Sequence, residues 1–184
     1  MASNNAANVS VGKPKATGAI FVAPSGTAVP TDATTPLAAA FANIGYAGES
    51  GVVNSVSTDN DSINAWGGDE VDNFRTSRSE TFSFTAIETN AVTLKLVYGD
   101  DNVTVESDSI AVIHNGAELP LQVVVFEIAM KGSRVKRIVV PSAKVTEVGD
   151  VTYVDDSPIG YEVTLAALPD QAGNTAYEYI AEVV

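Results

Sequence analysis

The sequence predicts a mainly β fold, a β-sandwich or partly closed barrel with one α-helix on its flank. Val, Thr, Ala, Gly, Asp and Ser dominate the composition, and this bias favours strands and turns over helices. Roughly ten short segments with strand-type alternation recur between turn residues. The chain has 184 residues, 45% of them apolar, which suits a single domain with a proper core.

The first 17 residues are predicted to form a flexible, polar arm, and residues 18–184 a single β-sandwich domain. The arm is rich in Asn and Ala, as is typical of a disordered terminus. Alternatively, it orders only against a neighbouring subunit. Gly18–Ala23 follows as a short strand. The next segment is predicted as a loop, with one helical turn at Leu37–Phe41.

Strands are predicted at Glu49–Ser57 and, as a hairpin, at Val71–Thr76 and Ser79–Ile87. A long polar loop is predicted between them, at about residues 58–69, with Trp66 in a small apolar island. A loop of this length inside a compact domain is usually functional or disordered. Trp66 either packs onto its own domain, the commoner case, or anchors a partner.

The segment Ala91–Tyr98 is predicted to be the helix. Glu88-Thr89-Asn90 supplies N-cap chemistry and Gly99 a C-terminal stop. Alternation of Val92, Leu94 and Leu96 leaves a strand as the alternative.

The second half of the chain is predicted to be strands and turns. Pro120–Lys131 is the most apolar strand and is expected at the centre of the sheet. Asn115-Gly116 before it is a hairpin turn signal. The other predicted strands are Val103–Glu106, Ile110–His114, Arg134–Pro141, Lys144–Val148, Val151–Val154, Pro158–Leu168 and Thr175–Val183.

The charge balance argues against several functions. With 23 acidic and 10 basic residues, the chain carries a net charge of −13, which repels nucleic acids and anionic membranes. There are no cysteines, and no apolar run approaches the roughly 20 residues that span a bilayer. The N-terminal sequence lacks the apolar core of a signal peptide, so export by the usual route is not expected.

No motif for catalysis, metal or cofactor binding is found, so an enzyme is not expected. The one histidine, His114, has no partner of metal-ligand type. Asp59-Asn60-Asp61 with Glu70 resembles a calcium loop, but Ile63 and Asn64 replace a required oxygen donor and the required glycine. Asp100-Asp101 and Asp155-Asp156 are paired carboxylates in turn sequences.

One basic cluster stands out, formed by Lys131, Arg134, Lys136 and Arg137. On a strand, Arg134 and Lys136 share one face and Arg137 lies on the other. The cluster either protects a solvent-facing edge from aggregation or pairs with acidic residues of another copy.

Several segments together resemble the major tail tube proteins of long-tailed, non-contractile bacteriophages, of the type found in actinobacterial phages. They are VGKPKATGAIFVAPSGTAVPTDATTPL, INAWGGD, ETFSFTAIET, LVYGDDNVT and KRIVVPSAKVTEVGDVTYVDDSPIGYEVTLAALPDQAGNTAYEYI, in order through nearly the whole chain.

The resemblance implies a self-assembling virion protein, made in the host cytoplasm, whose hexameric rings stack into a tail tube. It implies an acidic lumen that conducts DNA without holding it. The implied partners are further copies of the chain and the tape measure, tail tip and tail terminator proteins, with no membrane and no cofactor. The alternative is another virion β-sandwich, such as a decoration or adhesin-like protein.

Carried onto this sequence, the resemblance implies ring-to-ring contacts by the terminal arm and by the 58–69 loop. The expected contact residues are Trp66, Lys131, Arg134, Lys136 and Arg137. The expected lumen-lining residues are Asp69, Asp72, Glu80 and Glu127.

Overall fold

The fold is built almost entirely from antiparallel strands, as the sequence predicts. The structure, a computed structural model, describes residues 4–183, which contain eleven strands, one α-helix and two short 3-10 helices. The elements are β1 Lys13–Pro14, β2 Ile20–Pro24, β3 Ala42–Asn43, β4 Ala47–Asn64, β5 Glu70–Ala86, α1 Ala91–Tyr98, β6 Val103–Glu106, β7 Ser109–Val112, β8 Gln122–Met130, β9 Arg134–Val148, β10 Tyr161–Ala167 and β11 Tyr177–Glu182, with 3-10 helices at Ala6–Asn8 and Asp100–Asn102.

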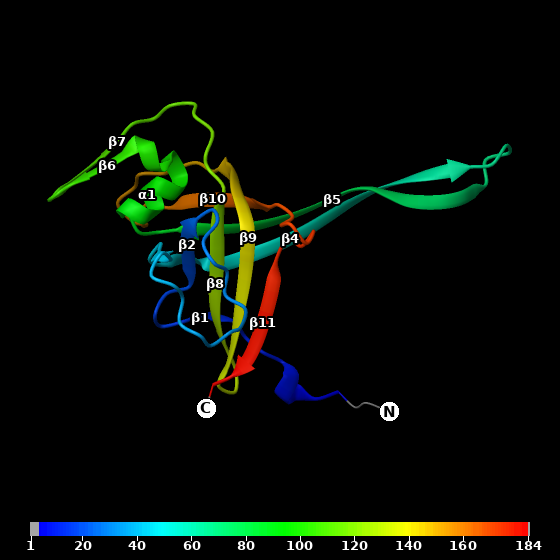
Figure 1. The fold of residues 1–184 in the computed structure, drawn as a ribbon, viewed down its shortest axis with the longest axis horizontal. Helices are drawn as coiled ribbons and strands as arrows, with labels where there is room; N and C mark the ends of the chain where they lie inside the picture. The colour runs from blue at the N-terminus through cyan, green and yellow to red at the C-terminus, as the bar shows by residue number, and fades with distance from the viewer. Residues whose placement is uncertain (1–3, 184) are drawn as a thin grey trace.

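Nine strands form one sheet, and β6 and β7 form a separate two-stranded sheet. The order in the large sheet is β3-β2-β8-β9-β10-β5-β4, with β1 added to β8 and β11 added to β9. The apolar strand β8 is therefore central, as predicted. In Figure 1, β4, β5 and β10 run across the direction of β8 and β11.

Strand β9 joins the two parts of the sheet because its partner changes along its length. Its first part, from Arg134 to Val139, pairs with β11, and its last part, from Ala143 to Val148, pairs with β10. The register against β8 shifts between these parts, in the stretch from Val140 to Ala143 that contains Pro141. Proline has no N–H to donate to the ladder and is tolerated at such a bulge.

The sheet curls until strands distant in its order face each other across the main core. The ring of Phe82 on β5 stacks on that of Phe126 on β8, with centroids 5.2 Å apart. The buried side chains of this core come from β2, β5, β8, β9, β10 and α1. This arrangement is the β-sandwich or partly closed barrel that the composition predicts.

Helix α1 closes one end of the core and has the predicted bounds. The side chain of Asn90 accepts a hydrogen bond from the N–H of Thr93, and the N–H of Gly99 donates to the carbonyl of Lys95. Leu94, Leu96 and Val97 are buried in the main core. The capping residues therefore selected the helix over the alternative strand.

A second, smaller core lies on the opposite face of β8 and β9. It contains Val123, Val125 and Val139 and is covered by Phe41 and Leu37 from the segment after β2. A hydrogen-bonded turn from Ala38 to Phe41 lies within the predicted helical turn. This segment is thus packed onto the sheet, although its sequence is loop-like.

The largest difference from the sequence prediction lies at residues 58–77. The predicted polar loop and the predicted 71–87 hairpin are replaced by a single long hairpin, in which β4 and β5 pair with each other from Val52↔Phe84 to Asn64↔Glu70. Most side chains of its outer part are exposed. A strand with neither face buried has no apolar alternation, so the pattern that predicts strands is absent there.

Smaller differences concern three segments. Residues 151–154 are not a strand, and Asn115-Gly116 lies in an irregular connection and not in a hairpin turn. The two strands predicted at 134–141 and 144–148 are the single strand β9.

Within the predicted N-terminal arm, residues 1–3 lie outside the described part. Lys13 and Pro14 pair with Ala129 and Ile128 of β8, which docks the second half of the arm on its own subunit.

Candidate functional site

The outer part of the β4–β5 hairpin is a long arm that projects from the domain (Figure 1). The main core reaches the hairpin no further out than Val52 and Phe82. From Val56 to Asn64 the hairpin continues for nine residues, which at about 3.3 Å per residue is about 30 Å. Packing within the subunit therefore does not explain this length.

The root of the arm is fixed by a polar network around Glu80. Its carboxylate accepts hydrogen bonds from Thr175, from Asn54 at 3.0 Å and from Arg78 at 2.9 Å. Burial raises the pKa of Glu80, but the hydrogen bonds from Thr175, Asn54 and Arg78 and the charge of Arg78 outweigh it and lower the pKa below its ordinary value. The ionised side chain thus holds the arm to the loop before β11.

The tip of the arm is a turn that presents Trp66 to solvent. The N–H of Ala65 donates to the carbonyl of Asp69 at 2.8 Å. Gly67 and Gly68 have φ values of 135° and 99°, which side chains other than glycine rarely adopt. Trp66 is fully exposed, so it does not pack onto its own domain.

One face of the outer arm alternates acidic and apolar side chains. The register places Asp61 opposite Phe74 and Ile63 opposite Asp72, and directly opposite residues lie on the same face. Ile63 is 52% exposed and Phe74 45% exposed. We call these four residues the acidic–apolar face.

The structure brings two of the predicted site residues together in the interior. Arg137 on β9 and Glu127 on β8 lie directly opposite each other and are 1% and 2% exposed. The guanidinium donates to the carboxylate of Glu127 and to the carbonyl of Asp32 at 2.7 Å, and Lys15 completes the group with an ion pair to Glu127 at 2.8 Å.

Glu127 and Arg137 therefore do not lie on a surface that a second subunit or a lumen could contact. Their ion pair fixes the segment of Asp32 and Lys15, a residue of the N-terminal segment, against β8 and β9. Neither burial nor pairing was visible in the sequence, because Glu127 and Arg137 are ten positions apart and Arg137 directly follows Lys136 in a basic cluster.

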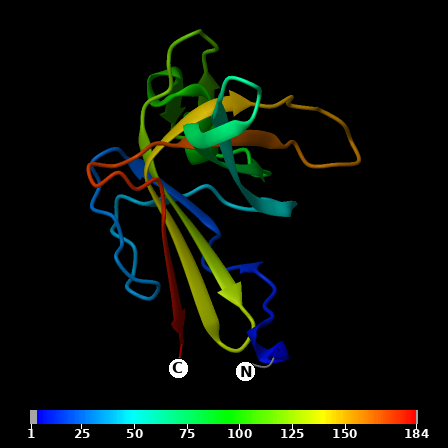
Figure 2. The same ribbon diagram turned by 90° about the vertical axis from the view of Figure 1, so that its right-hand side faces the viewer.

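The remaining basic residues lie near the turn between β8 and β9, at one end of the molecule (Figure 2). Lys131 is exposed in the turn. Arg134 donates to the hydroxyl of Ser10 at 2.6 Å, and Lys136 forms an ion pair with Glu178 at 2.7 Å.

A groove of about 400 Å³ lies at this end of the molecule. We call it the β8–β9 groove. Its lining includes Lys15, Ala129, Met130, Arg134, Val135 and Val183.

The four predicted lumen residues do not share a surface. Asp69 lies in the tip turn and Asp72 on the acidic–apolar face of the arm, both exposed. Glu80 lies in the root network, and Glu127 is buried. Alternation alone could not separate these environments.

A polar face that the sequence analysis did not single out lies on the root of the sheet. The outward side chains of β4, β5 and β10 share it, since Thr85 pairs with Glu162 and Ser83 with Thr164. The hydroxyls of Ser83 and Thr164 are 3.1 Å apart. We call this set the hydroxyl face: Val53, Ser55, Thr81, Ser83, Thr85, Glu162 and Thr164. The sequence signal for the hydroxyl face is a strict alternation of polar and apolar residues, Thr81, Ser83 and Thr85 with Phe82, Phe84 and Ala86.

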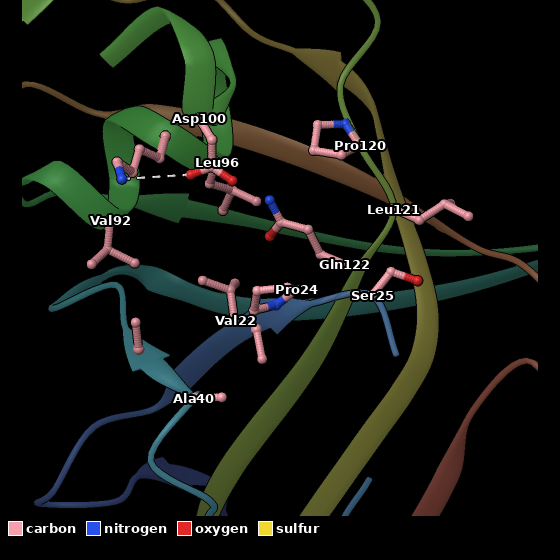
Figure 3. A pocket seen from close by; sticks show the side chains of 13 residues that line it. Val22, Pro24, Ser25, Ala40, Val92, Leu96, Asp100, Pro120, Leu121 and Gln122 are labelled. Atoms are coloured by element: carbon pink, nitrogen blue, oxygen red, sulfur yellow. Dashed lines mark ion pairs between the residues drawn. The ribbon is translucent and has the colours of Figure 1, made fainter. Parts of the chain in front are cut away.

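An apolar cleft of about 430 Å³ lies between β2, α1 and the start of β8. Figure 3 shows Val22, Leu96 and Gln122 around it, with the ion pair of Lys95 and Asp100 (3.7 Å) to one side. The side-chain oxygen of Gln122 is buried and accepts no hydrogen bond from the described residues. The cleft contains no pair of groups suited to acid–base or nucleophilic chemistry.

The other residues with possible chemistry are separated or structural. His114 packs on the ring of Tyr98, with centroids 4.4 Å apart. Within residues 4–183, no three His, Cys, Asp or Glu side chains are grouped so that they could hold a metal ion. No helix in the same range is long and apolar enough to cross a membrane.

Comparison with known families gives one match over the whole chain. The family model described as phage tail tube protein matches residues 1–184. No curated protein matches the chain.

Proposed function

Because the chain belongs to the phage tail tube protein family, we propose that its copies form hexameric rings, which stack into a tube whose lumen conducts DNA. The family is structural, so the protein is a component of the virion tail and not an enzyme. Its members assemble with themselves into a tube and with other tail proteins. The predictions of a self-assembling, non-catalytic virion protein are confirmed.

The observation that carries the ring-stacking proposal is the β4–β5 arm. An arm of about 30 Å that packs on nothing in its own subunit, with Trp66, Ile63 and Phe74 exposed along it, is suited to bury those side chains against another copy. We propose that Trp66 and the basic residues Lys131, Arg134 and Lys136 contribute to contacts between rings.

An open sheet edge supports ring formation. In the described part of the chain, β4 pairs with β5 on one side, and no strand pairs with its other side. An unpaired edge of 18 residues is a template for a strand of a neighbouring copy. Such pairing would join the sheets of six copies around the lumen.

We propose that the hydroxyl face lines the lumen in place of the four dispersed acidic residues. Its short, neutral hydroxyl side chains and the carboxylate of Glu162 offer no cation to bind DNA phosphates, since phosphate binding depends on Lys and Arg. On the neighbouring strand β9, Lys144 lies opposite Ala166, and its charge is paired with Glu118 at 3.0 Å. The tape measure protein would occupy this lumen before ejection, and the tail tip and terminator proteins would contact the end rings.

Electron microscopy of purified protein tests the proposal. Negatively stained samples, with and without the tape measure and tail tip proteins, should show tubes with a regular axial repeat and sixfold end views. Monomers under every one of these conditions would contradict it. Association with capsids and not with tails would favour a decoration protein.

A further inference from the structure

We propose that the arm of one copy docks, by its tip and its acidic–apolar face, into the β8–β9 groove of a second copy. This inference rests on the proposed assembly into a tube and names the surface that receives the arm.

The arm requires a partner that is both apolar and basic. Ile63, Phe74 and Trp66 leave apolar surface exposed, and burying such surface is favourable at about 25 cal/mol per Å². Residues 59–77 of the arm carry Asp59, Asp61, Asp69, Glu70 and Asp72, with Arg75 as their one basic residue. A partner surface of negative charge would repel it.

Charge excludes two of the three candidate surfaces. The β6–β7 hairpin exposes the apolar side chains of Val105 and Ile110. It lies at the end of the long axis opposite to the β4–β5 arm (Figure 1). It also carries Glu106 and Asp108, and would repel the arm. In the cleft of Figure 3, the charge of Lys95 is matched by Asp100, so this cleft offers no net attraction.

The β8–β9 groove has both required properties. Ala129, Met130, Val135 and Val183 supply apolar lining. Its guanidinium, Arg134, donates to two neutral oxygens, those of the Ser10 hydroxyl and the Lys131 carbonyl.

The charged residues that line the groove, Lys15 and Arg134, are both basic. Lys131 is exposed in the adjoining turn. Glu178 pairs with Lys136, and Glu182 lies opposite Arg134 across the ladder. Lys131, exposed at the tip of the turn, is then the cation best placed to meet an incoming carboxylate.

This contact joins two different surfaces, the arm of one copy and the groove of the next. Heterologous contacts of this kind build rings or open filaments, whereas a contact between identical patches stops at a dimer. The docking therefore provides an open-ended contact that can add ring after ring, in addition to the pairing at the β4 edge that is proposed to close each ring.

A disulfide trap tests the docking directly, because the chain has no native cysteine. The Ala65→Cys/Ser133→Cys variant places one thiol beside Trp66 and one in the β8–β9 turn. Oxidation of assembled tubes should give a ladder of covalent oligomers on non-reducing gels, whereas each single variant has no second thiol at this contact and should stay monomeric. The matched control is Ala65→Cys/Ser109→Cys, which places the second thiol on the β6–β7 hairpin and should give no ladder.

Charge exchange provides a second, independent readout. The Lys131→Glu/Arg134→Glu variant should raise the protein concentration needed for assembly by about tenfold or more. Adding Asp69→Lys and Asp72→Lys should reverse most of this increase.

Three results would overturn the docking and leave the tube function intact. The first is normal tubes of the Ala65→Cys/Ser133→Cys variant that give no ladder, and the second is a ladder from the Ala65→Cys/Ser109→Cys control instead. The third is normal assembly of the Lys131→Glu/Arg134→Glu variant. Failure of the unmodified chain to form tubes with its tail partners would instead contradict the proposed function.

Discussion

At the scale of single residues, the buried pair of Arg137 and Glu127 shows how far charge alone can mislead. In the sequence, Arg137 belongs to a basic cluster that looks like a surface patch. In the structure its guanidinium lies under the segment of Asp32, bonded to a carboxylate and a carbonyl. The residue stabilises the subunit and is not available for contacts with other copies.

Replacing Arg137 with Leu should lower the free energy of unfolding by about 3–5 kcal/mol, because it removes one partner of a buried ion pair. The matched control is Lys136→Ala, which breaks the exposed pair with Glu178 and should cost about 1 kcal/mol or less. Urea unfolding of both variants measures the difference. Equal, small effects would show that the Arg137 pair contributes no more than a surface pair.

Glu80 links stability to pH at the root of the arm. Its pKa is lowered in the folded state, so its contribution is fully present above about pH 4.5, its ordinary pKa, and is lost as the pH falls through the folded value. Glu80→Gln should cost about 1–2 kcal/mol at pH 7, and the gap to the unmodified protein should narrow at acidic pH. A gap of constant size from pH 7 to pH 3, in urea unfolding, would contradict this account.

At the scale of elements, the outer part of the β4–β5 hairpin adds little to the folded core, and we propose that it serves assembly. Its outer part is paired with itself and packs on nothing else in the subunit, so it contributes its own ladder of hydrogen bonds and no core. The helix α1 is the opposite case, since its caps and its buried face both serve the fold.

Replacing residues 59–77 with Asn-Gly should leave the domain folded but unable to assemble. Thr58 and Arg78 lie opposite each other, and a two-residue turn can join such a pair. The shortened domain should still unfold cooperatively, because the removed residues contribute nothing to the core, while electron microscopy should show no tubes. A milder control is Trp66→Ala, which keeps the arm and should weaken assembly. Tubes of normal repeat from the shortened chain would show that the arm is dispensable.

The elements that the sequence predicted best are those whose signals are local. Asn90 and Gly99 bracket the helix, and alternation identifies β10 and the inner part of β5. The outer part of β4 was predicted as a loop because all of Thr58–Asn64 except Ile63 is polar, whereas its partner Val71–Thr76 was predicted as a strand and lies within β5. The two predicted strands of β9 are one, since Pro141 looks like a stop and is in fact the site of a bulge.

At the scale of the whole molecule, function depends on which faces the assembled copies turn toward each other and toward the lumen. The net charge of −13 per copy opposes close packing of like subunits. In the proposed tube, the docking of the arm into the β8–β9 groove would supply a specific attraction that offsets this repulsion.

The hydroxyl face makes a prediction for the tube as a whole. Changing Glu162, which is exposed on β10, to Lys should leave tube assembly normal but slow DNA ejection, because six new cations per ring would bind phosphates. Glu162→Gln is the neutral control and should eject DNA at the normal rate. Ejection kinetics of particles built with each variant measure the effect. Equal rates for the two variants would place the lumen on another face.

The sequence by itself determined the mainly β class, the helix and its caps, the central strand β8, the acidic balance and the family. Each of these depends on local pattern or on total composition, which the chain carries before it folds. The tertiary structure decided the rest: that Glu127 and Arg137 are buried together, that residues 58–64 form a strand, and that Trp66 is exposed at the tip of an arm. Those outcomes depend on which distant segments pack against each other, and no local pattern encodes such contacts.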